Sequence, residues 1–188
     1  MMPSKESISK RGVSIVKQRH KLLHDKYRSD PSSAWITDAS EVIGLDFQDP
    51  FRTTVLINDK MKVPFKIGVH EAVGGDHDFP NPGDMLCASL ASCFESTLRM
   101  IANKLGIELL RTRIRATAQV DVRGTLMTDR SVPVGFQAMN MDAQVIAKNT
   151  DTKLLNALIK AAKQSCIVYQ TIKMGIPITV SEDIRINN

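Results

Sequence analysis

The sequence predicts a mixed fold of helices and antiparallel strands, with one domain behind a basic helical arm. Three observations lead to this prediction. A helix-forming run without Pro or Gly extends from Met85 to Leu105, pairs of strand-like stretches come before and after it, and a second amphipathic helix follows near residue 150. At 188 residues with 43% hydrophobic content, the chain can bury a core of its own. We therefore assign residues 1–30 to the arm and 31–188 to the domain.

The arm is expected to be helical over residues 3–29. Its apolar face is a narrow stripe at three- and four-residue steps, made by Val13, Val16, His20, Leu23 and Tyr27. Eight Lys or Arg against three acids give the arm a surplus of five positive charges, which equals the net charge of +5 of the whole chain. A basic arm leaves nucleic acid binding open, but no interleaved aromatic residues or known motif supports it. His20 and His24 lack a third metal ligand nearby, so we predict no metal site there.

The predicted strands before the long helix form a hairpin. Residues 34–40 are expected to be extended, and 51–57 form a strand that ends at a tight turn over 58–60. Residues 63–69 alternate apolar and other side chains, with a Pro that places this strand at a sheet edge. The loop over 74–80 (Gly-Gly-Asp-His-Asp-Phe-Pro) contains possible metal ligands, which we interpret as polar loop residues.

The long helix has clear end signals. Asn81 is a good N-cap, Asp84 places a negative charge at the positive end of the helix dipole, and Gly106 is a natural C-cap. Apolar residues occur nearly all the way round the helix, which predicts burial. Charged residues within it, such as Glu95 and Arg99, argue against a membrane span.

The second half of the chain predicts two more strands, a helix and a last strand. Residues 114–122 and 139–145 alternate apolar and polar side chains and are expected to pair. Residues 149–151 cap a helix that ends near Cys166, a short segment follows, and residues 176–180 form the last strand.

Three cysteines without a Cys-x-x-Cys pair argue for a reducing compartment, and no apolar leader is visible, so we expect the cytoplasm. Cys93 lies in the middle of the long helix and Cys166 near the end of the second. A buried Cys is usually a small apolar residue, whereas a functional pair needs thiols that meet and one thiolate. The spacing alone leaves both interpretations open. Cys87 points about 120° away from Cys93 on the helix, so we assign it a structural role.

Two segments resemble the central helix of the OsmC/Ohr family (osmotically inducible protein C and organic hydroperoxide resistance protein). They are residues 81–86, Asn-Pro-Gly-Asp-Met-Leu, and 91–94, Ala-Ser-Cys-Phe. The helix that ends in Lys-Gln-Ser-Cys at 163–166 matches the second family cysteine, and the strand over 176–180 matches the family's last strand. The resemblance extends over about residues 50–182.

The resemblance implies an α+β fold in which antiparallel sheets wrap around long central helices of an intertwined homodimer. It also implies thiol-dependent peroxidase activity in oxidative stress defence. Cys93 would attack an organic hydroperoxide and become a sulfenic acid, Cys166 would resolve it to a disulfide, and a dithiol reductant would restore both thiols. This chemistry predicts no cofactor, no metal and no membrane partner.

The chain differs from the family pattern at three places. The family Glu ten residues before the first Cys is Gly83, the turn over 58–60 lacks the activating Arg, and Ile167 replaces a Pro after the second Cys. Possible substitutes for the cation are Arg52, Arg99 and Lys60. The alternative to a peroxidase is a weakly active or inactive protein of the same fold, which binds a small apolar molecule or senses redox state.

Overall fold

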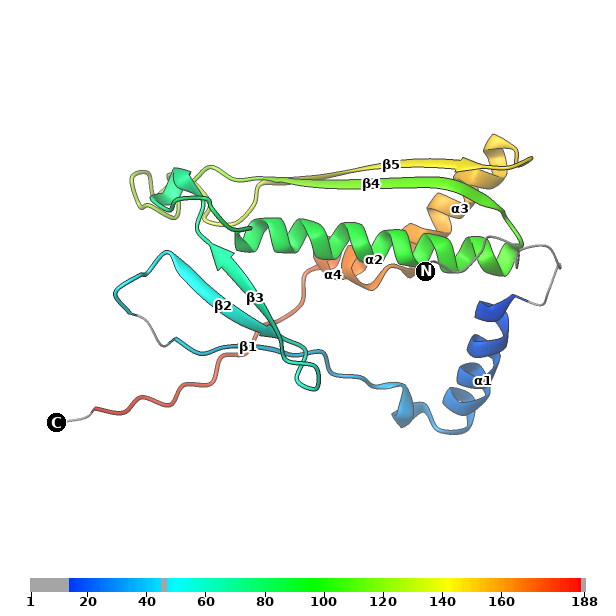
Figure 1. Cartoon of the computed structure of the whole chain (residues 1–188), viewed down its shortest axis with the longest axis horizontal. Coiled ribbons are helices and arrows are strands. Elements are labelled where there is room, and N and C mark those ends of the chain that lie inside the picture. Colours follow the sequence, from blue (N-terminus) through cyan, green and yellow to red (C-terminus); the bar gives the residue numbers. More distant parts are fainter. Residues whose placement is uncertain (1–13, 45–46, 187–188) are drawn as a thin grey trace, which may run out of the picture.

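A computed structural model describes residues 14–44 and 47–186 of the chain. Helix α2 (Pro82–Leu105) forms the axis of the molecule (Figure 1). Its ends are those that the sequence predicts. The Asn81 side chain accepts hydrogen bonds from the backbone of Gly83 and Asp84, Asp84 accepts one from the Asn81 backbone in return, and Gly106 ends the helix in a left-handed conformation.

Strands β4 (Leu109–Gln119) and β5 (Ala138–Ala147) form a two-stranded antiparallel sheet along one side of α2 (Figure 1). Its inner side chains pack against the core and include Ile114, Met141, Ala143 and Val145. The alternate residues face solvent, as the period of two predicts. The predicted pairing of these two strands is confirmed, although β4 begins and ends earlier than the expected 114–122.

Helices α3 (Thr152–Ser165) and α4 (Ile167–Met174) complete the core against α2. Asp151 caps α3 by accepting a hydrogen bond from Leu154 N at 2.7 Å. The buried core cluster is made of Phe94, Leu98, Ala102, Ile107, Leu158, Ala162 and Cys166. The core therefore lies between α2 and α3 and is covered by β4 and β5.

A second antiparallel sheet has the strand order β1–β2–β3, with bounds Ser40–Val42, Arg52–Ile57 and Val63–Gly68. The predicted hairpin is confirmed, and Pro64 lies on the edge strand β3 as expected. A 3₁₀ turn, η2 (Glu71–Val73), links this sheet to α2. The sheet extends away from α2 rather than covering it (Figure 1).

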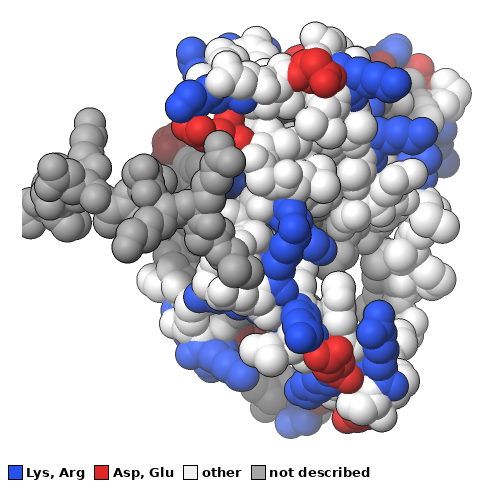
Figure 2. Space-filling model, turned by 90° about the vertical axis from the view of Figure 1, so that its right-hand side faces the viewer, with Lys and Arg blue, Asp and Glu red and all other residues white. Residues whose placement is uncertain are grey.

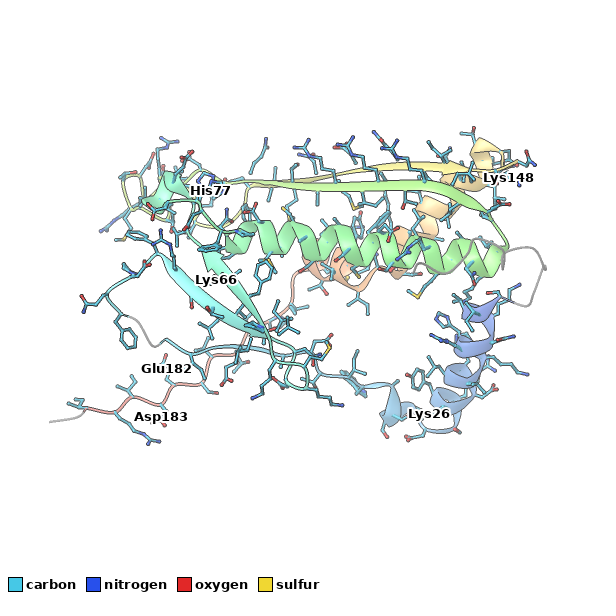
Figure 3. All side chains as sticks on the ribbon, viewed as in Figure 1. Lys26, Lys66, His77, Lys148, Glu182 and Asp183 are labelled. Carbon is cyan, nitrogen blue, oxygen red and sulfur yellow. The ribbon has the colours of Figure 1, made fainter. Side chains whose placement is uncertain are left out.

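Two expectations about burial and strands are wrong for the single chain. Residues 175–186 are extended but pair with no strand among the described residues, so the predicted last strand at 176–180 is not formed. Ile178 is 86% exposed, and Figure 3 places the side chains of Glu182 and Asp183 in open space. Helix α2 is buried on one side only, because the sheet of β1 to β3 does not cover it, and Ser89, Ser92 and Ser96 are exposed.

Helix α2 is also long and apolar enough, by length and composition alone, to cross a membrane. The same test is met by core helices of globular domains, and α2 supplies Phe94, Leu98 and Ala102 to the core. Its membership of this core accounts for its apolar character.

The arm contains helix α1 (Ile15–Ser29), followed by a 3₁₀ turn, η1 (Pro31–Ala34). Part of the predicted helix, including Val13, lies outside the described residues. The start of α1 is tied to the end of α2, because Asn103 Oδ1 accepts hydrogen bonds from Ser14 Oγ at 2.6 Å and Val16 N at 3.3 Å. Lys and Arg outnumber acidic residues at this end of the molecule (Figure 2).

Candidate functional site

Cys93 and Cys166 meet in the structure although 73 positions separate them in the sequence. Cys93 lies on α2, Cys166 lies between α3 and α4, and the two thiols are close enough for Cys93 to raise the pKa of Cys166. Cys93 packs against the core cluster that contains Cys166. Both are free thiols. The packing of α3 on α2 thus creates a dithiol from two separate elements.

Cys166 is completely buried, with 0% of its surface exposed. It ends α3 and caps α4, where its Sγ accepts a hydrogen bond from Tyr169 N at 3.4 Å. Burial raises the pKa of the Cys166 thiol, and the nearby Cys93 thiol raises it further, while the bond from Tyr169 N acts in the opposite direction. Cys166 is consequently held as a neutral thiol.

Cys93 is only partly buried, so it is the more accessible member of the pair. Cys87 lies six residues nearer the start of α2 and has no hydrogen bond to either thiol. Burial raises the pKa of Cys87, and the Asp84 carboxylate raises it further. The accessible half of the dithiol is thus Cys93.

The possible cation Arg52 is occupied elsewhere. Its guanidinium pairs with Asp49 at 2.8 Å and Asp78 at 2.9 Å, and also with Asp76. Asp49 and Asp78 raise the pKa of Arg52 above its ordinary value. Each of its three nitrogens already binds one carboxylate, so Arg52 is held within this acidic cluster rather than at Cys93.

Neither of the other predicted cations contacts Cys93 within the described residues. Arg99 Nε pairs with Glu95 Oε2 at 2.9 Å, and Glu95 Oε1 accepts a hydrogen bond from Thr112 Oγ1 at 2.8 Å. Lys60 lies in the exposed turn between β2 and β3, where its backbone binds Asn58. The structure therefore brings together the two thiols without any of the three predicted cations.

Gly83, at the position of the family Glu, faces an aromatic ring. A Cβ at this position would lie 2.9 Å from Cζ of Phe136 and 3.0 Å from Oδ1 of the capping Asn81. The Phe136 ring thus fills the space into which a carboxylate side chain would enter. Sequence reasoning did not identify Phe136, because only the path of the loop after β4 brings it to the start of α2.

The possible metal ligands remain scattered. The rings of His20 and His24 are 6.1 Å apart, and those of His70 and His77 are 4.3 Å apart. In the part of the chain that the structure describes, no three His, Cys, Asp or Glu residues gather in a way that could hold a metal ion. Asp76 and Asp78, which the sequence places in a polar loop, serve instead as partners of Arg52.

The fold and the paired thiols together define a class: an α+β protein in which a long core helix presents a dithiol. A family model described as OsmC-like protein matches residues 75–181, more than half of the chain. The chain belongs to the OsmC-like protein family. Arm helix α1 and the sheet of β1 to β3 precede the matched region.

Solved structures with the same fold have low sequence identity to the chain. An OsmC-like protein of unknown function from Vibrio cholerae is 12% identical, with a TM-score of 0.60 over 73% of this chain and 94% of that chain. An organic hydroperoxide resistance protein OsmC from Legionella pneumophila is 18% identical, with a TM-score of 0.56 over 75% and 92%. An OsmC-like protein from Mycoplasma pneumoniae is 14% identical, with a TM-score of 0.59 over 74% and 89%. Comparison with curated protein sequences gives no match.

Proposed function

We propose that this protein reduces organic hydroperoxides with a thiol pair, in which Cys93 is the nucleophile and Cys166 the resolving thiol. The observation that carries the proposal is the close approach of these two thiols at the edge of an apolar core. Membership of the OsmC-like family supports it, as do neighbours in fold named organic hydroperoxide resistance proteins. Free cysteines suit a reducing compartment, and we place the protein in the cytoplasm.

The proposed reaction has three steps. The Cys93 thiolate attacks the outer peroxide oxygen, the O–O bond breaks, and the alkoxide leaves and takes a proton to become an alcohol. The Cys166 thiol then condenses with the Cys93 sulfenic acid, which forms a disulfide and releases water. A dithiol donor finally reduces this disulfide and is itself oxidised to a disulfide. Cys166 needs no movement between elements for the second step, since it already contacts Cys93.

A homodimer is part of this proposal. The extended segment over 175–186 has exposed apolar side chains at alternate positions, Ile176, Ile178, Val180, Ile184 and Ile186. Alternation of this kind is typical of a β-strand, and here the segment has no neighbouring strand among the described residues to pair with. Trp35, which precedes β1, and Phe47, between β1 and β2, are exposed as well, as are Ser89, Ser92 and Ser96 of α2. A second copy would cover these surfaces, and the mass measured by light scattering tests this directly: a monomer at working concentration contradicts it.

The peroxidase is tested by treating the reduced protein with a small excess of cumene hydroperoxide and mapping its cysteines by mass spectrometry. We expect a Cys93–Cys166 disulfide in the wild type. Cys166→Ser should leave a sulfenic acid on Cys93 that dimedone traps, and Cys93→Ser should not react. Cys87→Ser is the matched control and should behave like the wild type.

Two outcomes would contradict the proposal. One is that Cys93 and Cys166 both stay reduced under excess peroxide. The other is that Cys87→Ser abolishes the reaction as fully as Cys93→Ser. Either result would favour the alternative, a protein of this fold that binds a small molecule without reducing peroxides.

A further inference from the structure

Helix α1 of the basic arm is attached to the rest of the molecule at the end of α2. Figure 1 shows α1 beginning beside the last turns of α2 and running away from the core. No residue of α1 is buried, so burial of apolar surface contributes little to this attachment. The family match begins at residue 75, so the arm lies outside the region that matches the family.

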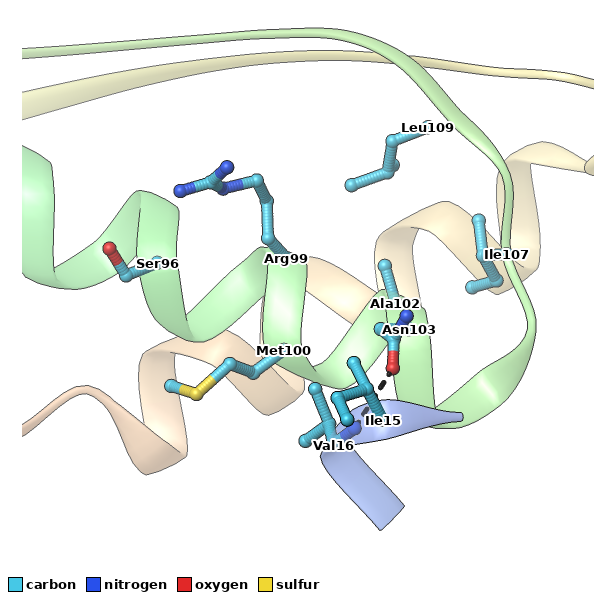
Figure 4. Close-up of a pocket in the computed structure, with 9 residues that line it drawn as sticks. All are labelled: Ile15, Val16, Ser96, Arg99, Met100, Ala102, Asn103, Ile107 and Leu109. Atoms are coloured by element: carbon cyan, nitrogen blue, oxygen red, sulfur yellow. Dashed lines mark hydrogen bonds between the residues drawn. The ribbon is translucent and has the colours of Figure 1, made fainter. Parts of the chain in front are cut away.

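Among the described residues, polar contacts join the arm to α2 at two places. The first is Asn103, whose Oδ1 accepts hydrogen bonds from Ser14 Oγ at 2.6 Å and from Val16 N at 3.3 Å (Figure 4). The second lies about one turn further along α1, where Nδ1 of His20 is 3.4 Å from Nζ of Lys104. Because the attachment consists of so few interactions, a change in one of them shifts its equilibrium.

The contact between His20 and Lys104 requires a neutral imidazole. A lysine ammonium has three N–H donors and no acceptor, so Nδ1 of His20 must accept, and the ring proton must be on Nε2. A protonated imidazole carries a donor at both ring nitrogens and has no acceptor for Lys104. Protonation of His20 therefore replaces a hydrogen bond by repulsion between two positive charges at 3.4 Å.

The surroundings of His20 oppose its protonation. Partial burial lowers the pKa of His20, the positive charge of Lys104 lowers it further, and His24 acts in the same direction. Lys104 belongs to α2, and His24 lies on α1 with its ring centroid 6.1 Å from that of His20. No carboxylate of the described residues offsets these two groups. An undocked arm returns His20 to water, so proton binding favours the undocked arm over the docked one.

We infer that the arm is held by a pH-sensitive contact, in which neutral His20 keeps α1 against Lys104 of α2 and protonated His20 releases it. Docking is strongest above the pKa of a free imidazole, about 6.5, and weakens as the pH falls below that value. The released segment is the basic part of the chain, so its positive charges become free to move away from α2. The inference concerns the arm alone and does not rest on the proposed peroxidase.

Hydrogen exchange of the full-length reduced protein at about pH 7.5 and about pH 5.5, on either side of the imidazole pKa, tests the inference. Protection is expressed relative to the intrinsic exchange rate at each pH. A helix of 15 residues is marginal in water on its own, so the amides of an undocked α1 lose protection. We expect protection over Ile15–Ser29 to fall roughly five- to tenfold at the lower pH, while protection of α3 stays unchanged.

Matched variants assign the effect to this contact. His20→Gln has a neutral side chain at both pH values and should show equal protection of α1 at both. His24→Gln makes the same substitution about one turn away and should still lose most of its protection at the lower pH. Lys104→Met keeps an apolar stem without the charge and should reduce the loss. Asn103→Ala should lower the protection of α1 at both pH values, since it removes the other point of attachment.

Light scattering at both pH values separates release of the arm from dissociation of an oligomer, and the inference predicts the same mass at both. Unchanged protection of wild-type α1 at the lower pH would overturn the inference. An equal loss of protection in the wild type and in His20→Gln, with or without a change in mass, would overturn it as well.

Discussion

Removing the side chain of Leu158 should damage both the core and the thiol pair. Leu158 is 0% exposed and belongs, with Ala162 and Cys166, to the face of α3 that packs against Phe94 and Leu98 of α2. Leu158→Ala leaves a cavity that this close-packed cluster can only partly refill. The expected loss is about 2.7–5 kcal/mol in the free energy of unfolding.

Leu154→Ala is the matched control on the same helix. Leu154 is 41% exposed, so its removal takes less apolar surface out of the core and opens no enclosed space. The change in helix propensity is the same at both positions, and the expected loss at Leu154 is about 1 kcal/mol. The difference between the two variants therefore reports the packing of α3 on α2.

The assay is urea unfolding followed by circular dichroism, under reducing conditions and at one protein concentration, because dissociation of an oligomer would add to the apparent stability. Formation of the Cys93–Cys166 disulfide after peroxide addition is the second readout. It should slow in Leu158→Ala, since Cys166 reaches Cys93 only through this packing. A difference below about 1 kcal/mol between the two Leu variants would refute the proposed role of the α2–α3 contact.

Three further predictions follow from local geometry. Burial raises the pKa of Cys166, so as the pH rises the unfolded chain loses this proton before the folded chain does. The contribution to stability is therefore full below about pH 8.5 and falls as the pH rises further. Thermal melts should show a smaller fall of stability with pH for Cys166→Ala than for the wild type, and an equal fall in both would contradict this. Asn81→Ala should cost about 1 kcal/mol in urea unfolding by removing the α2 cap, and no change would mean that the cap contributes nothing. Gly75→Ala should cost about 1–3 kcal/mol, because its Cβ would meet the backbone of Val69, while Gly135→Ala, with no atom within 4 Å, should stay near neutral; equal costs would exclude this explanation.

The elements set by neighbouring residues could be predicted from the sequence. Asn81 and Gly106 mark the ends of α2 through their own side chain or backbone conformation, and Asp151 does the same for α3. The hairpin of β2 and β3 follows from alternation on either side of a short turn. Such signals act over a few residues, so no tertiary contact is needed to read them.

The features that depend on distant contacts could not be predicted in the same way. The spacing of Cys93 and Cys166 left their meeting open, and only the resemblance to a family pointed to it. Three features depend on how loops and the arm fold back on the rest of the chain. They are the carboxylates around Arg52, the ring of Phe136 against Gly83 and the packing of α1 beside the end of α2. The prediction of a last strand was wrong because strand pairing needs a neighbour, and the segment over 175–186 has none among the described residues.

The burial of Cys166 has a consequence for regeneration in the proposed cycle. A dithiol donor approaches the sulfur of Cys93 more easily than that of the fully buried Cys166, so Cys166 becomes the leaving group. A thiol whose pKa is raised leaves slowly, because the departing thiolate is poorly stabilised. In the proposed cycle, this would slow the re-reduction of the disulfide. If the proposed cycle operates, the disulfide form would accumulate when dithiol donors become scarce, and the oxidised fraction would report the supply of reductant.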